Sequence, residues 1–120
     1  IPFYSTCAHH ICTFSGISHV AYLPDKSRAG LSKLARTVDY FSHRLTDQET
    51  ITQLSLNYLV GKLQPKAAAV TLIAEHLCLA QRGVQKPGTL TTTSALYGEF
   101  LNEPEARAEL LQLISLSKKG

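Results

Sequence analysis

Runs of β-branched and apolar residues, separated by turn-forming residues, predict four strands. The strands are expected over residues 1–6, 11–23, 67–79 and 89–96, and the pair Ser15-Gly16 is expected to bend the second strand. Alternation along the third strand puts one set of residues on a common face: Val70, Leu72, Ala74, His76 and Cys78. His76 and Cys78 are therefore predicted to point the same way.

Apolar positions that recur every three or four residues predict three helices. The first covers residues 30–45, with its apolar positions at Leu31, Leu34, Val38, Phe41 and Leu45. The second covers residues 46–63 and opens on a capping-box pattern, in which Glu49 would bond to the Thr46 amide. Its inward positions are expected at Ile51, Leu54, Tyr58 and Leu59. The third covers residues 102–117 and has Pro104 in its first turn.

The order of these elements is two strands, two helices, two strands and a closing helix. This order predicts an α+β fold, in which a four-stranded antiparallel sheet carries two helices on one face. We expect a single domain over residues 1–120, because a chain of this length buries one modest core.

Composition narrows the class of protein. Apolar residues make up 44% of the chain and charged residues 18%, which is typical of a folded soluble protein, and no apolar run is long enough to span a membrane. The net charge of +3 is small, and the cations lack interleaved aromatic residues, which disfavours a nucleic-acid-binding module. Three cysteines are an odd number, which disfavours a disulfide framework and favours a reducing, cytoplasmic setting.

Two short stretches, Cys7-Ala8-His9-His10 and Glu75-His76-Leu77-Cys78, concentrate the metal-binding chemistry of the chain. Zinc prefers thiolate sulfur and imidazole nitrogen, and a catalytic zinc keeps three protein ligands and an open position for water. The stretches offer four or five such donors, and each keeps a histidine that could move protons. Cys7 and His10 can share one metal only if the chain turns between them. The alternative is a set of unrelated buried cysteines and a surface histidine.

Six motifs in one order resemble the GTP cyclohydrolase I family over nearly the whole chain: Cys7-Ala8-His9-His10, Gly30-Leu31-Ser32-Lys33-Leu34-Ala35-Arg36, Gln48-Glu49, Glu75-His76-Leu77-Cys78, Arg82-Gly83-Val84 and Thr91-Thr92-Thr93-Ser94. The resemblance implies the tunnelling fold, in which the strands of neighbouring subunits join into a barrel. It implies a homo-oligomer, a pentamer ring that stacks into a decamer, with active sites at subunit interfaces. It also implies hydrolysis of GTP to 7,8-dihydroneopterin triphosphate and formate, the first step of a pterin or tetrahydrofolate pathway.

The resemblance further implies a role for each matching site residue. Zn2+ would be the cofactor and would activate water for attack at C8 of guanine. The zinc ligands would be Cys7, His10 and Cys78. His9 and His76 would transfer protons, and Ser32 would act near the ribose. Glu49 with Gln48 would hold the guanine edge, and the triphosphate would be held by Lys33, Arg36 and Arg82. Without the family, Glu49 is better explained as a helix cap. Lys33 and Arg36 are then explained equally well as a solvated helix face and as ligand-binding cations.

Two departures from the family pattern leave alternatives open. Ala8 stands where the family usually has glutamate, and the family's N-terminal helical region does not precede Ile1, so we expect an upstream segment to have been removed. The alternatives are a divergent tunnelling-fold homologue that acts on another purine or pterin, and a non-catalytic assembly subunit. The presence of His9, His76 and Glu49 argues against an assembly subunit, because a scaffold needs none of them.

Overall fold

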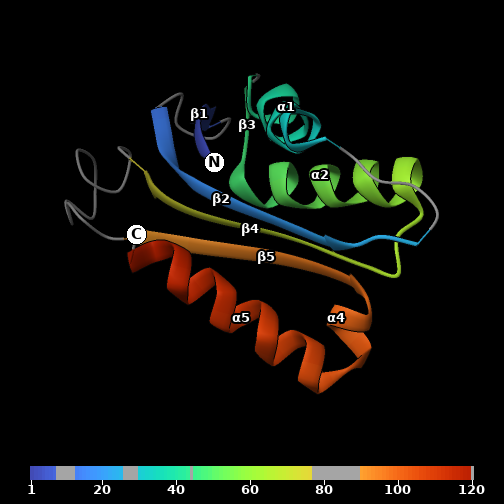
Figure 1. Ribbon diagram of the computed structural model, residues 1–120. Coiled ribbons are helices and arrows are strands. Elements are labelled where there is room, and N and C mark those ends of the chain that lie inside the picture. Colours follow the sequence, from blue (N-terminus) through green and yellow to red (C-terminus); the bar gives the residue numbers. More distant parts are fainter. Residues whose placement is uncertain (8–12, 26–29, 44, 77–89, 120) are drawn as a thin grey trace.

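A five-stranded sheet in the order β3-β1-β2-β4-β5 crosses the middle of the computed structural model (Figure 1). Its main strands are antiparallel neighbours: β1 (Pro2–Cys7), β2 (Thr13–Leu23), β4 (Ala67–His76) and β5 (Leu90–Gly98). The two-residue β3 (Leu45–Thr46) pairs in parallel with the end of β1. The structure describes residues 1–7, 13–25, 30–43, 45–76 and 90–119. The four antiparallel strands are those that the sequence predicts.

Helices cover both faces of this sheet. On one face lie α1 (Leu31–Ser42) and α2 (Gln48–Leu63), and on the other lie the short α4 (Glu99–Asn102) and α5 (Pro104–Lys119), as Figure 1 shows. The larger core, under α1 and α2, includes Phe3, Phe14, Val38, Ile51 and Leu72. A smaller core, on the α5 side, joins Ala67, Ala69, Phe100 and Leu110. The prediction of two helices on one face is therefore confirmed, and the closing helix covers the opposite face.

The central strand β4 divides its side chains between the two cores. Ala68, Val70, Leu72 and Ala74 belong to the larger core, whereas Ala67 and Ala69 belong to the smaller one. This confirms the predicted alternation for Val70, Leu72 and Ala74. His76 is the last residue of β4, and Cys78, which was predicted to continue the same face, lies outside the described residues.

Strand β2 runs from Thr13 to Leu23 without a break, so the bend predicted at Ser15-Gly16 is wrong. Gly16 lies opposite Ala74 where β2 pairs with β4. A Cβ atom at this position would collide with the backbone of Ile73 and Ala74. The glycine therefore permits a close approach of two strands rather than a turn.

The segment between α1 and α2 also differs from the prediction. α1 ends at Ser42, because Leu45 and Thr46 pair with the end of β1 and so belong to the sheet. This pairing removes Thr46 as the N-cap of the second helix, and the predicted capping box is wrong. Asp47 is the N-cap instead, and its carboxylate accepts a hydrogen bond of 2.7 Å from the Thr50 amide.

Within α2, the predicted inward set is right at the buried Ile51 and Leu59 and wrong at Tyr58. Tyr58 is 47% exposed and packs against the ring of Phe41 in α1, with ring centroids 6.0 Å apart. The face of α2 that meets the sheet contains polar residues, namely Gln48, Thr52 and Ser55. A pattern based on apolar residues cannot locate such a face, and this explains the error at Tyr58.

Candidate functional site

The ends of β1 and β4, at Cys7 and His76, lie at the same end of the sheet. Both strands are antiparallel to β2, which lies between them, so they run in the same direction. Cys7 is the last residue of β1 and His76 the last of β4, and two strand spacings of about 4.8 Å each separate the two strands. Four other predicted site residues, His9, His10, Cys78 and Arg82, lie outside the described residues.

The described residues do not by themselves form a metal site. Among residues 1–7, 13–25, 30–43, 45–76 and 90–119, no group of three or more His, Cys, Asp or Glu side chains is arranged to hold a metal ion. The backbone nevertheless delivers Cys7 and His76 to neighbouring places at the same edge, as the sequence requires for a shared site.

Glu49 lies in the first turn of α2, and its side chain is exposed. Because Asp47 caps this helix, Glu49 is not needed as the cap. Within the part of the chain that the structure describes, Glu49 makes no hydrogen bond or ion pair. The positive end of the helix dipole favours a carboxylate at this place, and both its oxygens remain available to a ligand.

Gln48, the neighbour of Glu49, is instead buried between α2 and the sheet, with only 1% of its surface exposed. Its Nε2 donates hydrogen bonds to the carbonyl oxygens of Leu72, at 3.0 Å, and of Thr91, at 2.9 Å. The same nitrogen lies 3.2 Å from the Thr93 hydroxyl. These contacts tie the Gln48 amide nitrogen to β4 and β5 rather than to a ligand.

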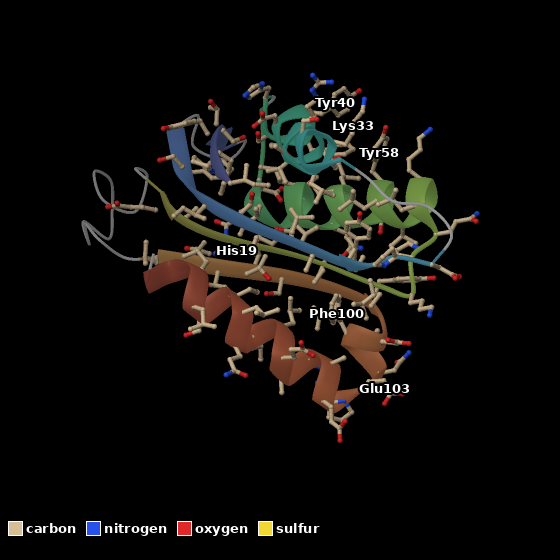
Figure 2. All side chains as sticks on the ribbon, in the orientation of Figure 1. His19, Lys33, Tyr40, Tyr58, Phe100 and Glu103 are labelled. Atoms are coloured by element: carbon tan, nitrogen blue, oxygen red, sulfur yellow. The ribbon has the colours of Figure 1, made fainter. Side chains whose placement is uncertain are left out.

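The first two turns of α1 carry Ser32, Lys33 and Arg36, and all three side chains are exposed. They are exposed because Leu34 and Val38 form the buried side of the helix. Figure 2 shows Lys33 on α1, at the side of the molecule away from α5. No side chain of the described residues caps this helix, whose N-cap is Gly30. The Lys33 amide donates to the Gly30 carbonyl oxygen at 3.0 Å. A helix start with two nearby cations is a kind of site that binds phosphate oxygens.

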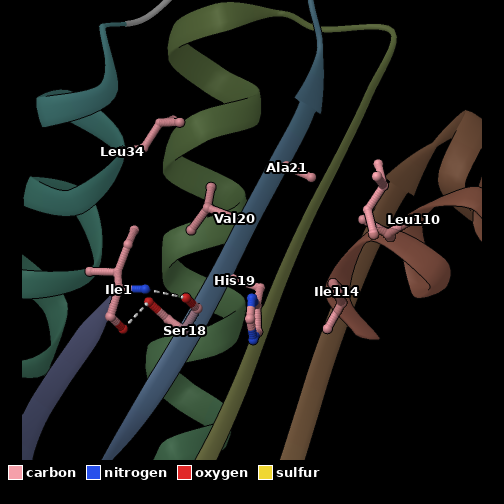
Figure 3. A pocket seen from close by; sticks show the side chains of 9 residues that line it. Ile1, Ser18, His19, Val20, Ala21, Leu34, Leu110 and Ile114 are labelled. Atoms are coloured by element: carbon pink, nitrogen blue, oxygen red, sulfur yellow. Dashed lines mark hydrogen bonds between the residues drawn. The ribbon is translucent and has the colours of Figure 1, made fainter. Parts of the chain in front are cut away.

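A pocket with a volume of about 460 Å³ opens beside β2, away from these residues (Figure 3). Ile1 and Ser18 line part of it, and the Ile1 amine donates a hydrogen bond of 2.8 Å to the Ser18 carbonyl. Apolar side chains from α1 and α5, such as Leu34 and Leu110, line other parts. None of the described site residues predicted from the sequence lines this pocket, so it is not part of the predicted site.

Comparison with known proteins identifies the family. A family model described as GTP cyclohydrolase I matches residues 1–115. The chain belongs to the GTP cyclohydrolase I family. The matched range includes both Cys/His stretches and the starts of α1 and α2, so it covers every residue that the sequence predicts for the site.

Individual relatives agree with this assignment. GTP cyclohydrolase 1 of Mycolicibacterium gilvum is 50% identical over 116 residues, which are 95% of this chain and 57% of that protein. GTP cyclohydrolase 1 of Sulfurihydrogenibium sp. is 50% identical over 119 residues, which are 99% of this chain and 64% of that protein. The chain therefore spans less than two thirds of the length of these curated relatives.

A solved structure supports the fold. The crystal structure of the archaeosine synthase QueF-Like in the apo form has a TM-score of 0.64 to this chain, at 17% identity. The likeness covers 82% of this chain and 88% of that chain. It shows the fold alone, which is the tunnelling fold that the sequence predicts. No helix in the described part of the chain is long and apolar enough to cross a membrane.

Sequence reasoning missed the residues that support the predicted guanine site. Asp47 caps α2, and Thr52 and Thr93 hydrogen-bond to each other and to Gln48. The sequence contains one signal, the run of threonines in the last strand, but spacing alone does not show that these threonines face α2. Thr52 and Thr93 lie 41 residues apart in the chain, so only the folded structure reveals the pair.

Proposed function

We propose that the complete protein hydrolyses GTP to 7,8-dihydroneopterin triphosphate and formate. The observation that carries this proposal is the family match over residues 1–115, which spans the whole predicted site. The exposed carboxylate of Glu49 and the exposed cations of α1 supply the two kinds of group that a guanine nucleotide requires. The product would enter a pterin or folate pathway in the cytoplasm.

Glu49 is proposed to recognise the guanine base. A carboxylate can accept hydrogen bonds from both N1–H and the 2-amino group of guanine, whereas adenine cannot offer this pair of donors. The exposed position of Glu49, and the absence of a hydrogen bond or ion pair to it among the described residues, support this role over a capping role.

Lys33, Arg36 and Arg82 are proposed to hold the triphosphate, with Ser32 near the ribose. Lys33 and Arg36 share the exposed side of α1, close to its uncapped first turn. Guanidinium and ammonium groups form charge-assisted hydrogen bonds with phosphate oxygens. Arg82 completes the set by its place in the family motif.

Cys7, His10 and Cys78 are proposed to hold zinc. Strand register supports the fit, because Ser5 and His76 both pair with Phe14 and are therefore level with each other across β2. Cys7 follows Ser5 by two residues in the sequence, and Cys78 follows His76 by two, so we infer that both thiols reach one region. Two thiolates and one imidazole match the donors of a catalytic zinc centre. When bound, zinc would supply a Lewis acid that activates water at neutral pH.

His9 and His76 are proposed to move protons between water and the base. Histidine is suited to this because its ordinary titration range lies near neutral pH. His76 ends β4 and precedes the proposed zinc ligand Cys78 by two residues, so its backbone would lie near the proposed reaction centre. His9 adjoins the proposed ligand His10 in the same way.

A homo-oligomer is proposed, first a pentamer ring and then a decamer. Among the described residues, β5 has a neighbour on one side only, β4, so the described part of the protomer leaves one edge of this nine-residue strand unpaired. β3 covers only Thr6 and Cys7 of β1 at the other edge of the sheet. Side-by-side addition of identical subunits would pair both edges, and a closed barrel would leave none open.

The proposal is tested by incubating the complete protein with GTP and zinc. Formate release, and neopterin fluorescence after oxidation and dephosphorylation, should both appear. Residues 1–120 alone are assayed in parallel, because this chain spans only part of its relatives' length. Turnover of another purine or pterin without turnover of GTP would reject the proposed substrate. A folded, zinc-loaded protein that turns over none of these compounds would favour an assembly subunit.

A further inference from the structure

A small polar network begins at Gln48, the residue that precedes Glu49 in the first turn of α2. We call it the Gln48 network, and it consists of Gln48, Thr52 and Thr93. Besides the contacts of Gln48 Nε2 with Leu72, Thr91 and Thr93, the Thr52 hydroxyl donates to the Gln48 carbonyl oxygen at 2.9 Å. The Thr52 and Thr93 hydroxyl oxygens lie 2.7 Å apart. Gln48 and Thr52 are 1% and 3% exposed and Thr93 is half-buried, so most of the network lies in the interior of the protein.

Interior polar groups of this kind fix orientation more strictly than apolar packing does. A buried amide that loses its partners is costly, and the partners of Gln48 lie on three different residues. The side chain therefore has one favourable arrangement, in which the first turn of α2 sits against β4 and β5. Apolar contacts between the same elements would allow the helix to slide or rotate slightly.

The position of the network relates two parts of the predicted site. Gln48 precedes Glu49, and Asp47 on its other side holds the Thr50 amide. Thr91, one of the acceptors of Gln48, lies opposite Ala74 in β4, two residues before His76. The network thus connects the turn that carries Glu49 to the strand ends that lead toward the proposed reaction centre.

We propose that Gln48, Thr52 and Thr93 are positioning residues that fix the direction of the Glu49 carboxylate and thereby set the selectivity for guanine. This inference rests on the proposed function. Two parallel hydrogen bonds from one base to one carboxylate require the two groups to be nearly coplanar. A shift of about 1 Å in such a contact has a large effect on binding and rate. Selectivity for the 2-amino group should therefore depend on residues that never touch the nucleotide.

The experiment compares the dissociation constants of 7-deaza-GTP and 7-deaza-ITP, measured by calorimetry on the complete, zinc-loaded protein. Carbon replaces N7 in these analogues, so the ring is not opened during the measurement. Hypoxanthine lacks the 2-amino group of guanine. The ratio of the dissociation constant of 7-deaza-ITP to that of 7-deaza-GTP therefore reports that single contact. Glu49→Ala removes the proposed contact itself and so gives the lowest ratio expected of these variants. It should reduce the ratio by about tenfold or more.

Thr93→Val removes the hydroxyl from the network while keeping the shape of the side chain, and it should reduce the ratio by about three- to tenfold. Thr93→Ser keeps the hydroxyl and should restore the ratio. The matched control is Thr71→Val, because the Thr71 hydroxyl lies 3.3 Å from that of Ser94 in the same pair of strands, one position away from the network. This control should leave the ratio unchanged.

The double variant Glu49→Ala/Thr93→Val should show the same ratio as Glu49→Ala alone, because the network acts through Glu49. An unchanged ratio in Thr93→Val, with a reduced ratio in Glu49→Ala, would overturn the positioning role and leave the proposed function intact. An unchanged ratio in Glu49→Ala would instead reject Glu49 as the guanine contact. Equal loss in Thr93→Val and Thr71→Val would show a general effect of strand destabilisation and would also overturn the inference.

Discussion

The first turns of α1 and α2 both carry residues proposed to bind GTP, yet the two turns are held differently. Asp47 caps α2, and Gln48 and Thr52 tie the same turn to the sheet. α1 begins at Gly30 with no cap from a described side chain, and its cations are exposed. A rigid turn suits a planar base, whose recognition needs aligned hydrogen bonds. Long, adaptable cations suit a triphosphate, whose charge is spread over many oxygens.

The largest effect is expected from Gln48→Leu. The substitution leaves the Thr93 hydroxyl and the carbonyls of Leu72 and Thr91 without their donor, so the free energy of unfolding should fall by about 3 kcal/mol. Urea unfolding followed by circular dichroism measures this change. The control is Gln53→Leu on the same helix, whose exposed amide reaches only Asn57 at 2.9 Å. This control should change stability by less than about 0.5 kcal/mol. Equal losses in both variants would show that the hydrogen bonds of Gln48 hold the start of α2 no more firmly than an exposed side-chain pair does.

Glu49→Ala should weaken binding of 7-deaza-GTP by about 2 kcal/mol, or roughly thirtyfold, because a charged hydrogen-bonding partner of the base is lost. Stability should change little, since Asp47 rather than Glu49 caps the helix. Calorimetry and urea unfolding on the same variant separate the two effects. Glu105→Ala is the matched control, because Glu105 also lies in the first turn of a helix, on the opposite face of the sheet. A loss of stability with unchanged affinity would return Glu49 to a capping role.

Asp47→Ala and Gly30→Ala form a pair that tests the two helix starts directly. Asp47→Ala should reduce the free energy of unfolding by about 1 kcal/mol, because the Thr50 amide loses its acceptor. Gly30→Ala should be tolerated within about 0.5 kcal/mol. Gly30 has φ of −69°, nothing lies within 4 Å of an added Cβ among the described residues, and no cap hydrogen bond is lost. Thermal or urea unfolding of both variants measures the difference, and equal losses would contradict it.

The smallest effect is expected when α1 is given a side-chain cap like the one that Asp47 provides for α2. Gly30→Asp should add a cap to α1 and stabilise the protein by about 0.3 kcal/mol. The new carboxylate would lie beside the proposed triphosphate site, so affinity for 7-deaza-GTP should fall by about 0.5 kcal/mol, and less at high salt. Gly30→Asn supplies a neutral cap as the control. A Gly30→Asp variant that binds the nucleotide as tightly as Gly30→Asn would argue against phosphate binding at this turn.

Sequence patterns predicted the parts of this protein that depend on local periodicity. Alternation in β4 correctly placed Val70, Leu72 and Ala74, because each of them belongs to the larger core. Gly16 was misread as a turn residue because its requirement comes from the backbone of the neighbouring strand, at Ile73 and Ala74. Ile73 and Ala74 lie 57 and 58 residues further along the chain, so the sequence around Gly16 gives no local sign of that contact.

In the candidate site, too, local features were predicted and contacts between distant residues were not. The residues of the candidate site were predicted from their chemistry and family motifs, but the residues that support them were not. Thr46 was predicted to cap the second helix, but it pairs with Cys7 in the sheet, and Asp47 is the cap instead. Gln48 was read as a ligand contact, and its partners Thr91 and Thr93 lie 43 and 45 residues further along the chain. Local spacing carries no information about such distant hydrogen bonds.

The central place of β4 has a consequence for amide hydrogen exchange. β4 pairs with β2 along its whole length and with β5 along nearly all of it, and residues such as Ala68 and Val70 are fully buried. Its amides should therefore exchange with solvent only when the whole domain unfolds, and they should be among the slowest in the protein. His76 is the last residue of this strand. A histidine proposed to transfer protons is thus attached to the most protected backbone of the domain, and motion that admits the nucleotide has to occur in other elements.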